Sequence, residues 1–246
     1  MDLISVIVPF YKKKKFIKET ISSVLNQTYL NIEIIIVYDD PEKDDLKYLI
    51  NFFGKNEKIK IIVNDKNLGA GLSRNKGISE SGGKYICFLD ADDIWHREKI
   101  LKQIYFMKKH NFKISHTSYT IIDQNNQIKS TRKAKSFYNY RDILKSCNIG
   151  LSTVILDRDI ITNDLKFPDL KTKEDFVLWL KILQSGLYIG AIEEKLSFWR
   201  KTKNSLSSSV LQKLIDGYRV YRIYMKYNPF KSLYLLICLS LNFLKK

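Results

Sequence analysis

Glycine and proline are scarce in this 246-residue sequence, with 10 Gly and 4 Pro, about half of the share that the two residues have in an average chain. This scarcity excludes a collagen-like, disordered or linker-rich protein. Aromatic residues make up 13% of the chain and hydrophobic residues 45%, which indicates a sizeable core. The length fits one large α/β domain, or one domain with an appendage.

Cysteine and long apolar runs are also rare. The three cysteines are far apart and form no CxxC pair, which argues against a disulfide framework and for a reducing compartment. An apolar run over residues 3–10 precedes the basic run over 12–15, whereas a secretory signal has the opposite order. The longest apolar stretch, 233–244, is shorter than the roughly 20 residues that a helix needs to span a bilayer. The sequence therefore predicts neither export nor a membrane span.

Acidic residues are outnumbered, because 42 Lys and Arg stand against 26 Asp and Glu and give a formal net charge of +16. A charge of this size predicts a polyanionic partner: nucleic acid, a nucleotide phosphate or an anionic membrane. The excess is concentrated after residue 194, where 11 basic residues and one acidic residue, Asp216, give a net charge of 11 − 1 = +10.

The first half of the chain alternates strand-like and helix-like patterns. This order predicts a doubly wound, mostly parallel α/β sheet. The expected strands are 3–8, 32–38, 59–63 and 84–89, and the expected helices are 16–25, 46–53 and 68–79. Beyond residue 93 we expect helices over 95–109, 140–147 and 175–184, strands over 114–122 and 153–156, and a helical tail over the last 45 or so residues.

Ligands of a doubly wound sheet bind at the carboxyl ends of its strands. Pro9 and Tyr11 follow the first expected strand, and Asp39 and Asp40 follow the second. A carboxylate there can accept hydrogen bonds from a ribose or a base edge. Taken alone, each motif is a weak signal, because the first is also read as a plain strand end and the second as a polar turn before Pro41.

The segment 67–77 combines three glycines with Arg74. Glycines permit close backbone approach, and an arginine on the following helix could grip a diphosphate with its bidentate fork. The glycine spacing matches neither a Walker loop nor a Rossmann fingerprint. A turn followed by a solvated arginine is the alternative interpretation.

Carboxylates gather at two further points. Asp90, Asp92 and Asp93 end the fourth strand, where they repel one another unless a cation is present, and such oxygen ligands favour Mg²⁺ or Mn²⁺. Helix capping is the alternative and explains only one of the three. Glu174 and Asp175 begin a helix, where they offer a general base or simply complement the helix dipole.

In combination these motifs resemble glycosyltransferase family 2, whose members are inverting nucleotide-sugar enzymes of the GT-A fold. The resemblance extends over roughly the first 207 residues. It is carried by the segments Ser5–Tyr11, Val37–Asp40, Asn67–Gly77, Phe88–Asp93, Lys173–Trp179, Phe198–Arg200 and Ser205–Ser207.

The resemblance implies a role for each matching residue. Asp175 corresponds to the catalytic base, and Glu174 and Trp179 fall in the acceptor site. Asp90 and Asp92 form the family's DxD motif, which holds Mn²⁺ or Mg²⁺. The implied donor-binding residues are Pro9, Tyr11, Asp39, which would read the uracil edge, Asp40, Arg74 and Asp90.

One departure from the family pattern lies after the second strand. The usual Asp-Asp-Gly-Ser is Asp39-Asp40-Pro41-Glu42 in this chain. Proline cannot take the positive φ of the glycine, so we expect a different loop. The change affects the role of Asp40 more than that of Asp39.

The resemblance implies a GT-A domain over 1–207, with a nucleotide-binding half to about residue 93 and an acceptor half over about 94–207. The basic tail, 208–246, is expected to lie on an anionic membrane or, alternatively, to pack its aromatic side chains onto the domain. The implied activity is inverting transfer of a hexose or N-acetylhexosamine, from a UDP-sugar to a saccharide or lipid-linked saccharide. The implied place is the inner face of a bacterial cytoplasmic membrane, in surface-polysaccharide biosynthesis.

Two rival functions fit parts of the sequence. A nucleic-acid-binding protein would also be basic, but carboxylates at the strand ends would repel phosphates, so we expect no nucleic-acid partner. A nucleotidyltransferase or phosphatase also uses paired aspartates. Phosphatases of the haloacid-dehalogenase type place them after the first strand, where this chain has Pro9 and Tyr11.

Overall fold

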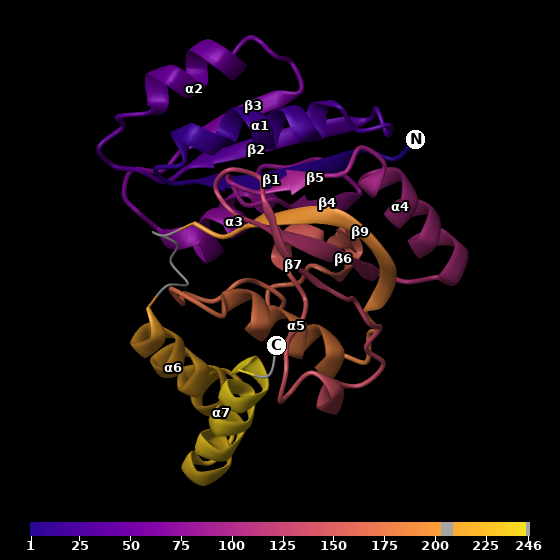
Figure 1. Ribbon diagram of the computed structural model, residues 1–246, viewed down its shortest axis with the longest axis vertical. Helices are drawn as coiled ribbons and strands as arrows, with labels where there is room; N and C mark the ends of the chain where they lie inside the picture. The colour runs from indigo at the N-terminus through magenta and orange to yellow at the C-terminus, as the bar shows by residue number, and fades with distance from the viewer. Residues whose placement is uncertain (203–208, 245–246) are drawn as a thin grey trace.

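The computed structural model describes residues 1–202 and 209–244 (Figure 1). The motif at Ser205–Ser207 lies outside these ranges. The first part of the chain forms the expected alternation, with bounds within a few residues of those expected. Its elements are β1 (Ile4–Phe10), α1 (Lys14–Leu25), β2 (Ile32–Tyr38), α2 (Leu46–Phe53), β3 (Ile59–Val63), α3 (Gly69–Ser79) and β4 (Tyr85–Phe88).

The middle of the chain departs from expectation in three places. The helix expected from 95 begins only at Lys99, because Ile94 and Trp95 pair with a later strand, and the helix expected over 140–147 shrinks to one 3₁₀ turn. The expected strand at 153–156 starts two residues later. The elements are β5 (Ile94–Trp95), α4 (Lys99–His110), β6 (Ile114–Ile122), β7 (Ile128–Arg132), η1 (Tyr140–Asp142), η2 (Leu151–Thr153), β8 (Ile155–Asp157), η3 (Arg158–Ile160), α5 (Glu174–Gln184) and β9 (Gly190–Arg200).

Strand β9 has no counterpart among the expected elements. Its central residues 193–195 are charged and exposed, so the sequence shows no alternation of apolar and polar residues there. The strand forms because β6 pairs with it in parallel and β5 pairs with it antiparallel. Tertiary pairing, not local propensity, creates this strand.

The nine strands form one sheet in the order β3-β2-β1-β4-β8-β6-β9-β5, with β7 paired to β6. The part made of β3, β2, β1 and β4 is parallel, and β8 joins it antiparallel. This arrangement confirms the α/β class, with a parallel half followed by a mixed half. Figure 1 shows α2 and β3 at one end of the molecule and the C-terminal helices at the other.

Both faces of the parallel half are covered, which explains its continuous apolar strands. Ile4, Val6 and Val8 of β1 face a cluster shared with α1, α2 and α4, while Ile7 faces a cluster shared with α3 and α5. Helix α3 approaches β1 closely at Gly77, where an added Cβ would lie 2.4 Å from a methyl of Ile7. This close contact fixes the helix that carries Arg74.

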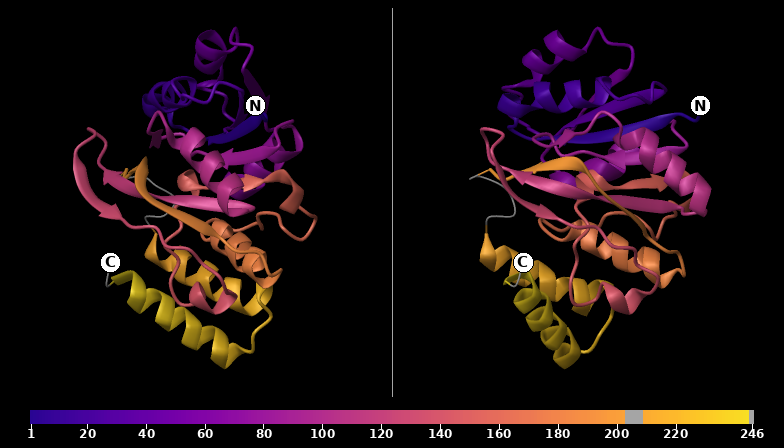
Figure 2. Two further views of the ribbon diagram at one scale, coloured as in Figure 1. Left: turned by 90° about the vertical axis from the view of Figure 1, so that its right-hand side faces the viewer. Right: turned by 45° about the vertical axis from the view of Figure 1, so that its right-hand side comes forward.

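The C-terminal segment is helical, as expected, and packs against α5 and the residues that precede it (Figure 2). Its elements are α6 (Val210–Arg219), a π-helical turn η5 (Val220–Tyr224) and α7 (Pro229–Leu244). Tyr221 and Leu235 are buried in the same cluster as Phe176 of α5, and the Tyr221 hydroxyl donates to the Leu144 carbonyl. One face of the tail therefore belongs to the core.

Among the helices in 1–202 and 209–244, none combines the length and apolar character that a membrane crossing requires.

Candidate active site

The carboxyl ends of β1, β2 and β4 meet at one edge of the sheet. The parallel register places Phe10 beside Tyr38 and Ile7 beside Phe88. The residues that follow these strands are therefore neighbours, as the sequence predicts. Pro9 is half-buried at the end of β1, and the Tyr11 ring just beyond it is 42% exposed, free to meet a ligand.

Asp39 ties the end of β2 to the glycine-containing segment. Its carboxylate is buried and accepts hydrogen bonds of 2.8 Å from the side-chain amide of Asn64 and from the backbone N–H groups of Leu68 and Gly69. Gly69 has φ +80°, a conformation that glycine adopts without strain. Asp39 is thereby held rigidly at the strand edge.

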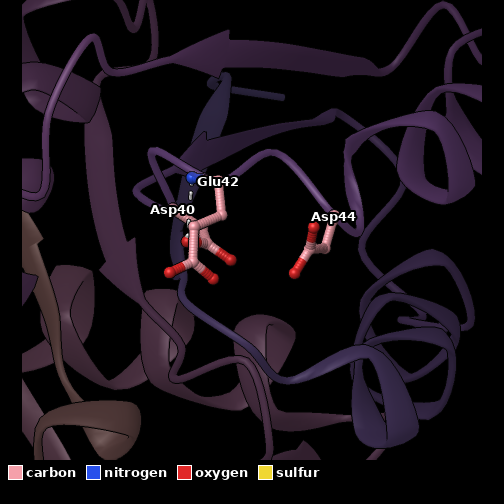
Figure 3. Close-up of side chains that lie close together, drawn as sticks. All are labelled: Asp40, Glu42 and Asp44. Carbon is pink, nitrogen blue, oxygen red and sulfur yellow. Dashed lines mark hydrogen bonds between the residues drawn. The ribbon is translucent and has the colours of Figure 1, made fainter.

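The loop after Asp39 is acidic where the family pattern has Gly-Ser. Carboxylate oxygens of Asp40, Glu42 and Asp44 lie within 4.8 Å of one another (Figure 3). Asp40 is buried, whereas Glu42 and Asp44 are exposed and Glu42 pairs with Lys12 at 2.6 Å. The altered loop thus changes the surroundings of Asp40 and leaves the bonds of Asp39 intact.

Arg74 lies in the interior and bridges two carboxylates. It is 3% exposed, and its two terminal nitrogens donate to Asp90 at 2.6 Å and to Glu174 at 2.7 Å. The guanidinium group of Arg74, which the sequence assigned to a diphosphate, is therefore already bound to two carboxylates of the protein. Burial raises the pKa of Glu174 to about 7, against the lowering effect of the Arg74 charge.

Replacing Arg74 with methionine is expected to lower the free energy of unfolding by about 3 kcal/mol, since it leaves buried Glu174 without its counter-charge. Asp90 is one-third exposed, so solvent screening limits its share of this loss. Urea unfolding of the wild type, Arg74→Met and Arg74→Lys measures the effect, and the lysine variant should lose less. A methionine variant within about 0.5 kcal/mol of the wild type would contradict the bridging role.

The three carboxylates after β4 each have a partner within the protein. Asp90 pairs with Arg74, Asp92 pairs with Lys13 at 2.6 Å, and Asp93 accepts from the Ser152 hydroxyl and the Arg200 backbone N–H. Side chains distant in sequence therefore compensate part of the expected repulsion among the three carboxylates, without a metal ion. Burial and the neighbouring charges of Asp90 and Asp92 raise the pKa of Asp93 well above its usual range.

The ammonium group of Lys13 lies beside Asp92, at the carboxylate that was expected to bind a metal ion. It lies between β1 and α1, and its ammonium also donates to Thr202 at 3.1 Å. Burial raises the pKa of Asp92, and the Lys13 charge opposes this shift. Asp92 is thus a carboxylate that attracts a positive charge at the same edge as Asp39 and Asp90.

Asp175, in the first turn of α5, lies at a pocket of about 190 Å³. Its Oδ1 accepts from the Phe176 backbone N–H at 2.7 Å, and burial raises its pKa. Adjacent Glu174 points to Arg74 and hence toward Asp90. The pocket is lined by Cys147, Ile149, Thr172, Lys173, Asp175, Phe176, Lys213 and Phe243.

Glu174 and Trp179, which are expected at the acceptor site, do not line this pocket. Trp179 is fully buried on α5 and is not among the residues of this pocket, so an acceptor cannot touch it without opening the core. Glu174 is 9% exposed and faces Arg74. The sequence reasoning missed Lys213 and Phe243, which arrive from the tail. No local motif marks them, and only the interleaving of basic and aromatic residues in the tail was a signal.

An α/β sheet with carboxylates at the ends of β2 and β4, and a pocket with a further carboxylate at the start of α5, fits a nucleotide-sugar transferase of the GT-A class. The model of glycosyl transferase family 2 matches residues 5–158, more than half of the chain, and the protein belongs to this family. It is a glycosyltransferase.

Two relatives match almost the whole chain. It is 36% identical over 239 residues to the UDP-Glc:alpha-D-GlcNAc-diphosphoundecaprenol beta-1,3-glucosyltransferase WfgD of Escherichia coli, covering 96% of this chain and 91% of that protein. It is 37% identical over 239 residues to WfaP of Escherichia coli, described by the same activity, covering 97% and 92%.

The fold is also that of a solved structure. The crystal structure of S. aureus TarS, residues 1–349, in complex with UDP-GlcNAc superimposes with a TM-score of 0.77, covering 97% of this chain and 71% of that one. The sequence identity is 20%, so this likeness concerns the fold.

Proposed function

We propose that this glycosyltransferase moves a sugar from a UDP-sugar to a lipid-linked saccharide in surface-polysaccharide biosynthesis, with inversion. The observation that carries the proposal is the link from Asp90 through Arg74 to Glu174, which joins the strand-end carboxylates to the pocket of Asp175. The named activities of WfgD and WfaP support the donor and the acceptor class.

In this reaction, some of the site residues bind the donor and Asp175 acts as the base. Pro9, Tyr11 and Asp39 form the floor and edge of the donor site, and Arg74 contributes by holding Asp90 in place. Asp175 accepts the proton of the acceptor hydroxyl, whose oxygen attacks the anomeric carbon as the bond to the diphosphate breaks. Positioned general bases of this kind contribute on the order of 10²- to 10⁴-fold.

Asp92 and Asp90 fit a divalent cation, because they are oxygen ligands of the kind that Mn²⁺ and Mg²⁺ prefer. The ammonium of Lys13 at 2.6 Å from Asp92 shows that this carboxylate already attracts a positive charge. A cation held there would neutralise the charge that develops on the leaving diphosphate.

Release of free UDP tests the reaction class. The full chain with a UDP-sugar and Mn²⁺ should release UDP only when a saccharide acceptor is added. Equal release without any acceptor would identify a hydrolase and contradict the proposal. Retention of DNA in a salt-sensitive manner would instead favour the nucleic-acid alternative.

The outer face of the tail supports a location on the membrane surface. Large apolar side chains on this face are at least 40% exposed, while the opposite face is in the core. Such a face, with the tail's basic residues, suits a helix in the headgroup layer of anionic lipid at the cytoplasmic side. The exposed apolar residues are Val210, Leu211, Leu214, Ile215, Ile223, Phe230, Leu233, Tyr234, Ile237, Leu241 and Phe243.

Changing Ile237 and Leu241 together to serine is expected to weaken binding to anionic liposomes about tenfold, because both apolar side chains would enter the lipid interface. Sedimentation with liposomes measures the effect. Deleting the chain from Tyr227 is a poorer test than these substitutions, since Leu235 and Leu239 belong to the core.

The matched control is Ile50→Ser with Leu101→Ser, which removes similarly exposed apolar side chains from α2 and α4. This control should bind liposomes like the wild type. Rising salt should detach both the wild type and the control from the liposomes. Equal binding by the tail variant and the control would favour a tail that serves packing alone.

A further inference from the structure

Three lysines lie in or near the pocket of Asp175. Lys173 and Lys213 line the pocket, and Lys201, just after β9, is close enough to influence Lys213. In the part of the chain that the structure describes, none of the three forms an ion pair, although thirteen such pairs occur elsewhere. Burial and these two like charges lower the pKa of Lys213. The charge of Lys173 also acts on Asp175, whose pKa it lowers, so three lysines face one carboxylate at this pocket. An excess of positive charge around a pocket favours the binding of an anion.

A buried anchor holds Lys213 in this place. Asp216, one turn later on α6, is fully buried and accepts from the Thr172 backbone N–H at 3.0 Å and the Thr172 hydroxyl at 3.1 Å. This pair fixes α6 against the segment that leads into α5. Lys213 is thereby held at the pocket beside the start of α5, where Asp175 is the second residue of the helix.

The other end of the pocket is apolar. Phe243 of α7 lines it, with the Lys213 ammonium 5.5 Å from the ring centroid. Phe243 is 62% exposed, so the apolar end of the pocket lies at the surface of the molecule. One pocket is therefore lined by a carboxylate, by two cationic side chains and by an aromatic ring at the surface.

We propose that this pocket binds the phosphate groups of the acceptor, with Lys213 and Lys173 as the recognising residues. The acceptor would be a sugar phosphate or diphosphate ester of a lipid, whose sugar hydroxyl faces Asp175 and whose lipid leaves past Phe243. This assignment rests on the proposed function and adds the residues that select the acceptor.

Lys213→Met tests the proposal through acceptor choice. We compare kcat/KM for a sugar diphosphate ester of an alkyl alcohol with kcat/KM for the neutral alkyl glycoside of the same sugar. Loss of a charged contact to phosphate should reduce the first by between about tenfold and a hundredfold. The kcat/KM for the neutral glycoside should change less than about twofold, because this acceptor has no phosphate for Lys213 to contact. The KM for the donor should also change less than about twofold, because the donor does not contact Lys213.

Lys226→Met is the matched control, since Lys226 is an exposed lysine of the tail that does not line the pocket. The kcat/KM of this variant should equal that of the wild type for both acceptors. A Lys213→Arg variant keeps the charge and should retain most of the preference for the phosphate-bearing acceptor. An equal loss on both acceptors in Lys213→Met would show a merely structural role and overturn the proposal.

A binding measurement separates this proposal from the reaction itself. Inorganic pyrophosphate is titrated calorimetrically into the full chain with EDTA present, so that the carboxylates of the donor site have no divalent ion and repel it. Binding should occur in the wild type and fall at least about tenfold in Lys213→Met and Lys173→Met. Unaltered binding in both variants overturns the proposal, whereas failure of sugar transfer by the wild type alone overturns the proposed function.

Discussion

Asp175→Asn is expected to lower kcat by at least about a hundredfold while UDP binds with unchanged affinity. Asp175 lies at its own pocket, and the residues assigned to the donor are on the other side of the Arg74 bridge. An asparagine keeps the shape of the side chain but cannot take the proton of the acceptor hydroxyl. Steady-state kinetics and UDP titration calorimetry measure the two quantities.

The pH dependence of the same variant adds a second readout. Burial raises the pKa of Asp175, and a protonated carboxyl is not a base, so wild-type kcat should fall as pH drops through this raised pKa. The acid limb should be absent in Asp175→Asn. Asp164→Asn, an exposed carboxylate before α5, is the control and should behave like the wild type. Turnover of Asp175→Asn within about threefold of the wild type would leave Asp175 as a carboxylate that only complements its helix.

Asp92→Asn is expected to weaken Mn²⁺-dependent UDP binding by at least about a hundredfold, because a neutral amide replaces the carboxylate that attracts the cation. The fold should persist. The pair of Asp92 with Lys13 is partly open to solvent and contributes about 1 kcal/mol or less. Calorimetric titration of UDP with Mn²⁺ or with EDTA measures the binding, and thermal unfolding checks the fold.

Asp45→Asn provides the matched control, since Asp45 is also a largely buried carboxylate paired with a lysine, Lys14, but lies at the start of α2. It should bind UDP with Mn²⁺ as the wild type does. If both EDTA treatment and Asp92→Asn leave UDP binding and sugar transfer unchanged, the assignment of the DxD motif to a metal ion is wrong.

The sequence by itself determined the parallel half of the sheet and the edge at which the site lies. The buried strands are continuous β-branched runs and the helices between them have clear apolar periodicity, so local pattern and tertiary burial agree. In a parallel sheet, strand ends meet at one edge, so Asp39 and Asp90 could be placed together from their positions after two strands.

Only the tertiary structure decided which charged groups face one another. Arg74 grips Asp90 and Glu174, and Lys13 reaches Asp92 across 79 residues, because folding removes these groups from water and each then needs a partner in space. A sequence motif gives the residue type but not the partner. For this reason the sequence predicted the repulsion among Asp90, Asp92 and Asp93 but not the side chains that compensate part of it.

The same holds for elements whose stability comes from neighbours. Strand β9 lacks alternation and exists through pairing with β6 and β5. Trp179 lies one helical turn after the predicted base, yet its side chain is fully buried and does not line the pocket. Lys213 from the tail does line it, because buried Asp216 anchors α6 to Thr172. Burial and long-range packing, which no local pattern contains, thus determined which residues line the pocket of Asp175.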